Sequence, residues 1–206
     1  MAYQSTWYYT DLPEDVVNIL ERDLAENFDG SMADSKLQGD ALNKDKRNSY
    51  NAWVPTDHWV GGFIWHYIQR ANRENFLYDL RCIDGESMQY TRYEAGQFYG
   101  WHNDAGLSNQ YKPVTVGNRA EGLAQDFVNE NIELVRKLSF AMQLSDPDDY
   151  EGGNVQLLDE SGKSYISPRK RGCITLFDSR TQHRVLKVTK GIRKSLVGWA
   201  VGPRWK

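Results

Sequence analysis

Hydrophobic positions near the start of the chain predict two amphipathic helices. The first covers residues 11–28, and Pro13 suits its first position because proline lacks the N–H that an opening turn leaves unpaired. Its apolar residues recur at helical spacing: Val16, Val17, Leu20 and Leu24. After a polar link and a short strand-like segment at 49–55, Thr56 or Asp57 can cap a second helix that runs to about Tyr78. Two supporting helices are therefore expected before residue 80.

Beyond Leu80 the pattern changes to short segments rich in aromatic and β-branched residues, separated by Gly, Asp, Asn and Pro. These segments cover residues 88–96, 97–105, 136–146, 152–159, 172–179, 183–190 and 193–202. They predict antiparallel strands, and helices followed by many strands indicate an α+β, mainly β fold: a two-sheet jelly roll or barrel with helices on one outer side. We expect one domain, with residues 1–80 as mainly helical support and residues 81–206 as the core.

Alternation orients two of these strands, because successive side chains of a strand point to opposite faces. In residues 138–145 the large apolar side chains occupy one face, and Ser139, Ala141, Gln143 and Ser145 occupy the other. We therefore expect one face to pack and the other to leave room. In residues 193–199 the same rule places four side chains together: Arg193, Ser195, Val197 and Trp199. A cation, a hydroxyl and an indole on one face make an unusual core unless an anion binds there.

Composition is consistent with this picture of one folded unit. The chain has 206 residues, 40% of them hydrophobic and 26% charged, which is typical of one globular domain. The sequence shows neither a signal peptide nor a long apolar segment, so we expect a cytoplasmic protein without a membrane span. Cys82 and Cys173 are the two cysteines, and their unrelated spacing favours buried free thiols over a disulfide or a zinc site.

Charge is distributed unevenly along the chain, although the net charge is only −3. Residues 163–206 contain twelve Lys or Arg and a single acid, Asp178. One interpretation is that the two parts of the chain interleave and neutralise each other in the fold. The other is a positive face that attracts an anionic ligand.

The most informative stretch is Tyr93–Asp104, YEAGQFYGWHND. On a strand, His102 and Asp104 project to one face about 7 Å apart at the backbone, close enough to reach one metal ion. A third ligand must come from elsewhere, and His183 begins a later strand. Two His and one carboxylate are the set that non-haem Fe(II) uses while three coordination positions stay open. The other two histidines, His58 and His66, lie on the second predicted helix and are interpreted as surface or packing residues.

Ten residues after His183, Arg193 offers a planar fork of donors suited to a carboxylate, and Ser195 on the same face adds one more donor. Together with an iron site, this predicts a dicarboxylate co-substrate. At this point the sequence resembles the 2-oxoglutarate and Fe(II)-dependent oxygenases of the prolyl 4-hydroxylase type, and among them the PKHD-type hydroxylases. The resemblance extends from about Met88 to Pro203 in three blocks: RYEAGQFYGWHNDA, RKLSFAMQLSDPDDYEGGNVQLLD and RGCITLFDSRTQHRVLKVTKGIRKSLVGWAVGP.

This resemblance implies a double-stranded β-helix and roles for individual residues. It makes His102, Asp104 and His183 the iron ligands, and Arg193 the partner of the distal carboxylate of 2-oxoglutarate, with Ser195 as a helper. These residues match the family pattern in order and spacing.

Three aromatic residues also match. Tyr93 and Tyr99 correspond to the two tyrosines that precede the metal pair in this family, and Tyr93 is the one expected to touch the co-substrate. Trp199 matches a family tryptophan beside the iron, so Tyr99 and Trp199 are candidate catalytic residues. The alternative for all three is ordinary aromatic packing.

The reaction implied is oxidative decarboxylation of 2-oxoglutarate to succinate and CO₂ with O₂, coupled to hydroxylation of an unactivated C–H, with ascorbate as reductant. A peptidyl proline is the first candidate substrate. Two other substrate classes remain alternatives: a free amino acid or small molecule, and a nucleic acid, which is the less favoured partner. A further alternative is a non-enzymatic jelly-roll binding module. The long polar segment 105–131 is interpreted as a lid or substrate-binding loop, or else as an idle insertion.

Overall fold

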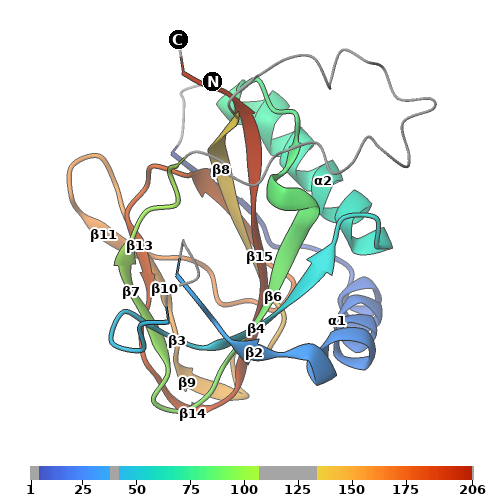
Figure 1. Ribbon diagram of the computed structural model, residues 1–206, viewed down its shortest axis with the longest axis vertical. Helices are drawn as coiled ribbons and strands as arrows, with labels where there is room; N and C mark the ends of the chain where they lie inside the picture. The colour runs from blue at the N-terminus through green and yellow to red at the C-terminus, as the bar shows by residue number, and fades with distance from the viewer. Residues whose placement is uncertain (1–4, 38–41, 107–133, 206) are drawn as a thin grey trace.

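The computed structural model describes residues 5–37, 42–106 and 134–205 and shows a mainly β fold with antiparallel sheets and two α-helices (Figure 1). The helices are α1 (Glu14–Phe28) and α2 (Trp59–Ala71), and α2 is followed by a π-helical turn, η2 (Asn72–Phe76). Two 3₁₀ turns complete the helical part, η1 (Asp29–Ser31) and η3 (Asp84–Glu86). The predicted α+β, mainly β class is confirmed.

The strands form a large sheet, a smaller sheet and a two-stranded ribbon. In spatial order the large sheet contains β1 (Thr6–Tyr9), β12 (Ile174–Asp178), β8 (Leu134–Gln143), β15 (Arg193–Pro203), β6 (Ser87–Tyr93), β4 (Tyr50–Pro55) and β2 (Ala33–Asp34), with β5 (Cys82–Ile83) also paired to β15. The smaller sheet contains β11 (Ser164–Ile166), β10 (Val155–Leu158), β13 (His183–Val185), β7 (Phe98–His102) and β3 (Arg47–Asn48). The ribbon pairs β14 (Val188–Gly191) with β9 (Tyr150–Gly152).

Helix α1 forms where the hydrophobic spacing predicted it. Pro13 occupies the N-cap position rather than the first helical residue, and Glu14 and Asp15 place acidic side chains in the first turn. Acidic residues there interact favourably with the positive end of the helix dipole. Val17, Leu20 and Leu24 are buried in the main core, so this helix covers the outer face of the large sheet (Figure 1).

The start and end of α2 differ from the sequence prediction. His58, not Thr56 or Asp57, is the N-cap, and its Nδ1 accepts a hydrogen bond from the Val60 N–H. The residues before it form a turn, in which the His58 N–H donates to the Pro55 carbonyl. The α-helix ends at Ala71, but the π-helical turn η2 continues it to Phe76, close to the predicted end at about Tyr78. Leu77 then adopts a left-handed conformation, and the Asn72 side chain bonds both the N–H and the carbonyl of Tyr78.

The alternation predicted for β8 is confirmed. Leu138, Phe140 and Met142 are buried in the core beneath the two helices, while Ser139 and Gln143 on the opposite face are also buried, on the side of the smaller sheet. The large sheet therefore packs one face on the helices. Its other face turns toward the smaller sheet and lines the cavity described below.

The first eighty residues supply strands as well as helices. Strands β1 and β2 form opposite ends of the large sheet, β4 pairs with β6, and β3 pairs with β7 of the smaller sheet. The strand-like segment 49–55 predicted from the sequence corresponds to β4, but the region was interpreted as mainly helical support, and the edge strands β1, β2 and β3 were not predicted. Its organisation as one domain with the core stays a prediction.

Two expectations about charge and thiols can be compared with the structure. Cys82 and Cys173 are free thiols as predicted, but only Cys173 is buried, whereas Cys82 is partly exposed. Basic residues of the C-terminal part pair with earlier acids, as in Lys170–Asp11, Arg171–Glu21 and Lys194–Asp29. This pairing supports interleaved, mutually neutralising charges. Among the described residues, no helix combines the length and hydrophobicity needed to cross a membrane.

Candidate active site

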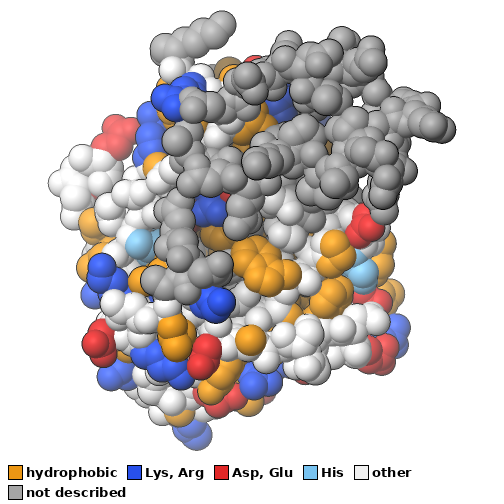
Figure 2. Space-filling view, viewed as in Figure 1, with side chains coloured by type: hydrophobic (Ala, Val, Ile, Leu, Met, Phe, Trp, Pro, Cys, Tyr) orange, Lys and Arg blue, Asp and Glu red, His pale blue; other side chains and the backbone are white. Residues whose placement is uncertain are grey.

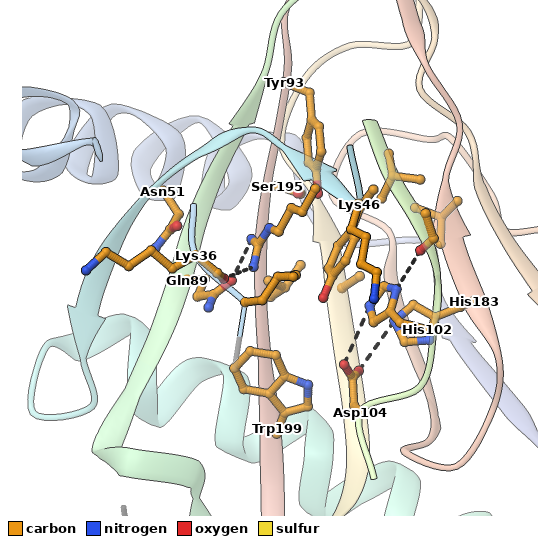
Figure 3. Close-up of a pocket in the computed structure, with 18 of the residues that line it drawn as sticks. Lys36, Lys46, Asn51, Gln89, Tyr93, His102, Asp104, His183, Ser195 and Trp199 are labelled. Carbon is orange, nitrogen blue, oxygen red and sulfur yellow. Dashed lines mark hydrogen bonds and ion pairs between the residues drawn. The ribbon is translucent and has the colours of Figure 1, made fainter. Parts of the chain in front are cut away.

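A cavity of about 1060 Å³ lies between the inner faces of the two sheets. Every candidate site residue from the sequence contributes to its lining: Tyr93, Tyr99, His102, Asp104, His183, Arg193, Ser195 and Trp199. Figure 3 shows the two histidines and Asp104 together on one side of this cavity, and Ser195 and Trp199 facing them from the large sheet. The volume is at the upper end of that typical for small-molecule sites.

His102, Asp104 and His183 meet at one point. His102 ends β7, Asp104 follows two residues later, and His183 begins β13, which pairs with β7 so that the two histidines are opposite each other. His102 Nε2 lies 3.7 Å from Asp104 Oδ1, and His183 Nε2 lies 3.4 Å from Asp104 Oδ2. One potential ligand atom from each residue lies within 4.8 Å of the others. The sheet pairing thus brings together residues far apart in the sequence.

Backbone contacts orient both imidazoles. Nδ1 of His102 lies 2.8 Å from the Gly100 carbonyl, and Nδ1 of His183 lies 3.0 Å from the Thr181 carbonyl. A carbonyl only accepts, so each Nδ1 carries a proton and each Nε2 faces the shared point. Burial lowers the pKa of His102, and the neighbouring His183 lowers it further, which favours the neutral form of His102.

Asp104 is held as a carboxylate. Ser139 Oγ donates a 2.7 Å hydrogen bond to its Oδ2, and Trp199 donates another to the same side chain. Burial alone would raise the pKa of Asp104, but the two imidazoles and these hydrogen bonds outweigh burial and lower it. Two imidazoles and one ionised carboxylate are the donor set expected of a divalent iron centre with open positions. The residues present therefore fit such an ion.

Arg193 lies deep in the same cavity, with only 1% of its surface exposed. Its Nη1 donates to Ser195 Oγ at 3.3 Å, its Nε has no hydrogen-bond partner, and its guanidinium lies 5.6 Å from the Tyr93 ring centroid. Among the described residues, no carboxylate forms an ion pair with it. Burial lowers the pKa of Arg193, yet an arginine stays charged, so the cavity holds an uncompensated cation that suits an anionic ligand.

The aromatic candidates surround these two groups. Tyr99 stacks on His102 with ring centroids 3.6 Å apart and planes at 16°. Burial raises the pKa of Tyr99 to about 12, so its phenol stays protonated. Tyr93 packs beside Arg193, and Trp199 lies under Arg136, whose guanidinium is 3.8 Å from the indole centroid. All three are thus in contact with groups of the site.

Several residues of the site were not predicted from the sequence. Ser139 was recognised only as part of a polar strand face, and its partner Asp104 lies in the segment that follows β7. Arg47, Asn51 and Gln89 also line the cavity and are buried. No motif spacing in the sequence marked these three residues as parts of a site. Arg47 in particular lies in a polar link, and only the fold shows that this link pairs with β7.

The segment 105–131, interpreted as a lid, lies outside the described residues except for Ala105 and Gly106. Its role as a lid or substrate-binding loop stays a prediction.

Comparisons with known proteins agree with this geometry. Residues 88–201 match the 2OG-Fe(II) oxygenase superfamily. A PKHD-type hydroxylase of Synechococcus sp. (strain JA-2-3B'a(2-13)) is 33% identical over 135 residues, covering 64% of this chain and 51% of that protein. Another, of Janthinobacterium sp. (strain Marseille), is 27% identical over 190 residues, covering 91% and 73%. The chain spans about half the length of the first of these curated relatives.

Solved structures share the fold. A Pseudomonas putida prolyl-4-hydroxylase superposes with a TM-score of 0.65 at 19% identity, covering 97% of this chain and 93% of that one. A Trichoplax adhaerens prolyl hydroxylase, solved with a hypoxia inducible factor peptide fragment, gives 0.68 at 15% identity, covering 95% and 83%. The fold is the double-stranded β-helix that the sequence predicted. Because the family match covers more than half of its residues, this chain belongs to the 2OG-Fe(II) oxygenase superfamily of enzymes.

Proposed function

We propose that this protein is an Fe(II)- and 2-oxoglutarate-dependent dioxygenase that hydroxylates an unactivated C–H, with a peptidyl proline as substrate. The observation that carries the proposal is the presence, in one cavity, of a cluster of two imidazoles and a carboxylate and of a buried arginine without an acidic partner. Such a pair of features suits a ligand that binds a metal at one end and carries a carboxylate at the other.

In this proposal His102, Asp104 and His183 hold Fe(II), and Arg193 with Ser195 binds the distal carboxylate of 2-oxoglutarate. When bound, the iron and the co-substrate, together with O₂, supply the oxidising chemistry. The protein contributes orientation. Carbonyls fix both imidazoles, and Ser139 and Trp199 fix the carboxylate, so that the ligand atoms converge before any ion arrives.

Apolar side chains form the wall of the site next to His183. Val155, Phe177 and Val185 line the cavity beside His183, and the Phe177 ring lies 4.7 Å from the His183 ring. Tyr93 shields Arg193 in the same way. Electrostatic interactions are stronger in such a low-dielectric pocket, which favours tight binding of an anionic co-substrate at Arg193.

The choice of a peptidyl proline rests on two kinds of support. Several neighbours in fold are prolyl hydroxylases, and one was solved with a peptide. In addition, Trp53 and Trp101 line the cavity and are 52% and 42% exposed, so indole rings are available at its opening. Aromatic rings of this kind are used by other domains to bind proline-rich segments.

The proposal also keeps the roles expected from the sequence for four further residues: Ser195, Tyr93, Tyr99 and Trp199.

A nucleic acid substrate has less support. Several cations of the C-terminal part, which suggested this alternative, form ion pairs with acidic residues. A non-enzymatic binding module would have no use for three oriented metal-ligand side chains.

The proposal is tested by incubating the purified protein with Fe(II), 2-oxoglutarate and ascorbate, and measuring succinate with and without proline-containing peptides. We expect succinate formation to rise with a suitable peptide and hydroxyproline to appear in equal amount. Ascorbate is included as the expected reductant, and its omission should shorten the active lifetime. Absence of succinate under all conditions would exclude the proposed activity.

The cytoplasmic location expected from the sequence stays a prediction that cell fractionation can test.

A further inference from the structure

Arg47 is a second buried guanidinium in the cavity, separate from Arg193. It lies on β3, is only 6% exposed and contributes to the cavity lining. Its Nε donates to Ser49 Oγ at 3.1 Å, its Nη2 to Gln89 Oε1 at 2.9 Å, and its Nη1 to the Lys36 carbonyl at 3.4 Å. A guanidinium has five N–H groups, so two remain available after these contacts.

The charge of Arg47 is not compensated by the described part of the chain, where no carboxylate forms an ion pair with it. Arg136, which also lines the cavity, shows the contrast, because its Nε binds Asp84 at 2.5 Å. The partners of Arg47 are neutral groups that orient its planar fork without neutralising it. A buried cation of this kind costs free energy unless an anion binds it.

Two amide side chains extend the polar wall beside Arg47. Gln89 and Asn51 line the cavity and are 6% and 8% exposed. The Gln89 side-chain oxygen accepts the hydrogen bond from Arg47, and the side-chain amide of Asn51 forms no hydrogen bond with the described residues. In Figure 3 Asn51 and Gln89 lie on the opposite side of Ser195 from His102 and His183. Figure 2 is drawn in the same orientation as Figure 1 and shows Lys and Arg side chains beside hydrophobic ones in the middle of the visible face of the molecule.

Arg47 is also close to the metal-ligand cluster. Its guanidinium carbon lies 4.8 Å from the centroid of Tyr99, and Tyr99 stacks directly on His102. One aromatic ring therefore separates this cation from the imidazole. Arg47 and the metal-ligand cluster therefore lie in neighbouring parts of one cavity, so a single substrate can contact both.

The cavity thus holds two buried guanidiniums, while 2-oxoglutarate has one carboxylate left after its 2-oxo-acid end has reached the metal. We propose that Arg47, with Gln89 and Asn51, binds a carboxylate of the substrate, on the hydroxylated residue or on the residue next to it. This inference rests on the proposed function and defines its substrate as an acidic one. The carboxylate could be the side chain of a neighbouring Glu or the free α-carboxylate of a terminal proline, and both sources can be tested.

Binding is measured first without turnover. The protein is loaded with 2-oxoglutarate and Zn(II), which has no redox chemistry, and three peptides are titrated by calorimetry. They are Ala-Glu-Pro-Ala with both termini blocked, Ala-Gln-Pro-Ala with both termini blocked, and acetyl-Ala-Ala-Pro with a free carboxylate. We expect at least one acidic peptide to bind about 30-fold or more tightly than the neutral one, as is typical for a buried charge pair.

Variants then assign the effect to Arg47. Arg47→Gln should remove the preference for the acidic peptide, while Arg47→Lys, which keeps the charge but not the fork, should retain part of it. Arg92→Gln is the matched control. Arg92 lies on β6 and stacks on Tyr50, its side chain points away from Gln89 by strand alternation, and it does not line the cavity. This control should keep the full preference.

Equal affinity of wild-type protein for all three peptides, or no binding of any of them, would overturn the inference without the need for a variant. So would an Arg47→Gln protein that binds the peptides normally but has lost affinity for 2-oxoglutarate. Succinate formed from 2-oxoglutarate by the Fe(II)-loaded wild-type protein, in the absence of peptide, reports separately on the proposed function. If succinate forms while the charge preference is absent, only the inference about Arg47 fails.

Discussion

The hydroxyl of Ser139 lies 2.7 Å from Oδ2 of Asp104 and donates a hydrogen bond to it. Ser139 belongs to β8 of the large sheet, whereas Asp104 follows β7 of the smaller sheet, so this bond links the two sheets at the metal-ligand cluster. A carboxylate fixed in this way keeps one orientation toward an ion. Its contribution to ion binding can be measured.

Ser139→Ala should weaken Fe(II) binding by about 10- to 100-fold, because the loss of a group that orients a ligand typically has this effect. The affinity is measured by titration of Fe(II) under anaerobic conditions. Ser164→Ala, an exposed position on β11, is the control and should bind as wild type. An unchanged affinity in Ser139→Ala would show that Asp104 is held well enough by its other contacts.

Removal of any one proposed iron ligand should abolish stoichiometric Fe(II) binding and succinate formation. The variants are His102→Ala, Asp104→Ala and His183→Ala. His66→Ala, an exposed residue of α2, should keep wild-type iron affinity. His58→Ala should also keep it, although its loss breaks the 2.9 Å pair with Asp23 and should lower the melting temperature. Near-normal turnover in any of the first three variants removes that residue from the ligand set.

Arg193→Ala should weaken 2-oxoglutarate binding by roughly 2–5 kcal/mol, the typical cost of truncating one member of a buried charge pair. Iron should still bind, and Arg193→Lys should be intermediate because it keeps the charge without the fork. Lys194→Ala is an internal control. Its side chain points to the other face, 3.6 Å from Asp29, as strand alternation predicted. Titration of 2-oxoglutarate into the Fe(II)-loaded protein decides, and equal affinities for Arg193→Ala and wild type would contradict the assignment.

Tyr99→Phe should keep the ring stacked on His102 and therefore keep iron affinity, while Tyr99→Ala should reduce it. A loss of turnover in Tyr99→Phe with unchanged iron and 2-oxoglutarate affinity would assign the hydroxyl a part in the reaction. Normal turnover would leave Tyr99 with packing alone. Because burial raises the pKa of Tyr99 to about 12, its ionisation should not shape the activity profile below about pH 10.

Asp178 should make stability depend on pH. Burial would raise its pKa, but hydrogen bonds from Arg180 and Tyr78 outweigh burial and lower it below the unfolded value near 4. A carboxyl whose pKa is lower in the folded state stabilises fully above the unfolded pKa and loses this contribution as the pH falls through the folded pKa. Urea unfolding should therefore show Asp178→Asn about 1–3 kcal/mol less stable at pH 7, with a gap that narrows below about pH 4. A gap that is constant from pH 7 to pH 3 would contradict this account.

The core of the site was readable from sequence because its residues recur at strand spacing. His102 and Asp104 are two positions apart, and Arg193 and Ser195 repeat this separation, so alternation predicted that each pair would share a face. Arg193 and Ser195 do lie on one strand, β15, whereas β7 ends at His102 and Asp104 follows it. The helix α1 was predicted from helical spacing of its apolar residues, and the packed face of β8 from strand alternation. Both patterns are visible in the sequence because each element buries one face.

What sequence analysis missed depends on contacts between distant segments. Arg47 lies in a polar link without periodicity, and only its pairing with Tyr99 on β7 turns it into the cavity. His58 caps α2 through Nδ1 while its Nε2 contacts Asp23 of α1, a contact that the local sequence does not encode. The hydrogen bond between Ser139 and Asp104 is of the same kind. Such residues carry no local signal, because each depends on the arrangement of two elements.

The position of β15 in the large sheet has a consequence for how the chain folds. This strand is the last in the sequence, yet it lies between β8 and β6 and is hydrogen-bonded to both. The two halves of the sheet therefore cannot join until β15, which follows the other strands in the sequence, has been inserted between them, and such non-local pairing makes folding slow. Arg193 and Trp199 arrive with this strand. A partly folded chain would consequently lack the arginine proposed to bind the co-substrate, so tight binding of 2-oxoglutarate would report on molecules that have completed their sheet.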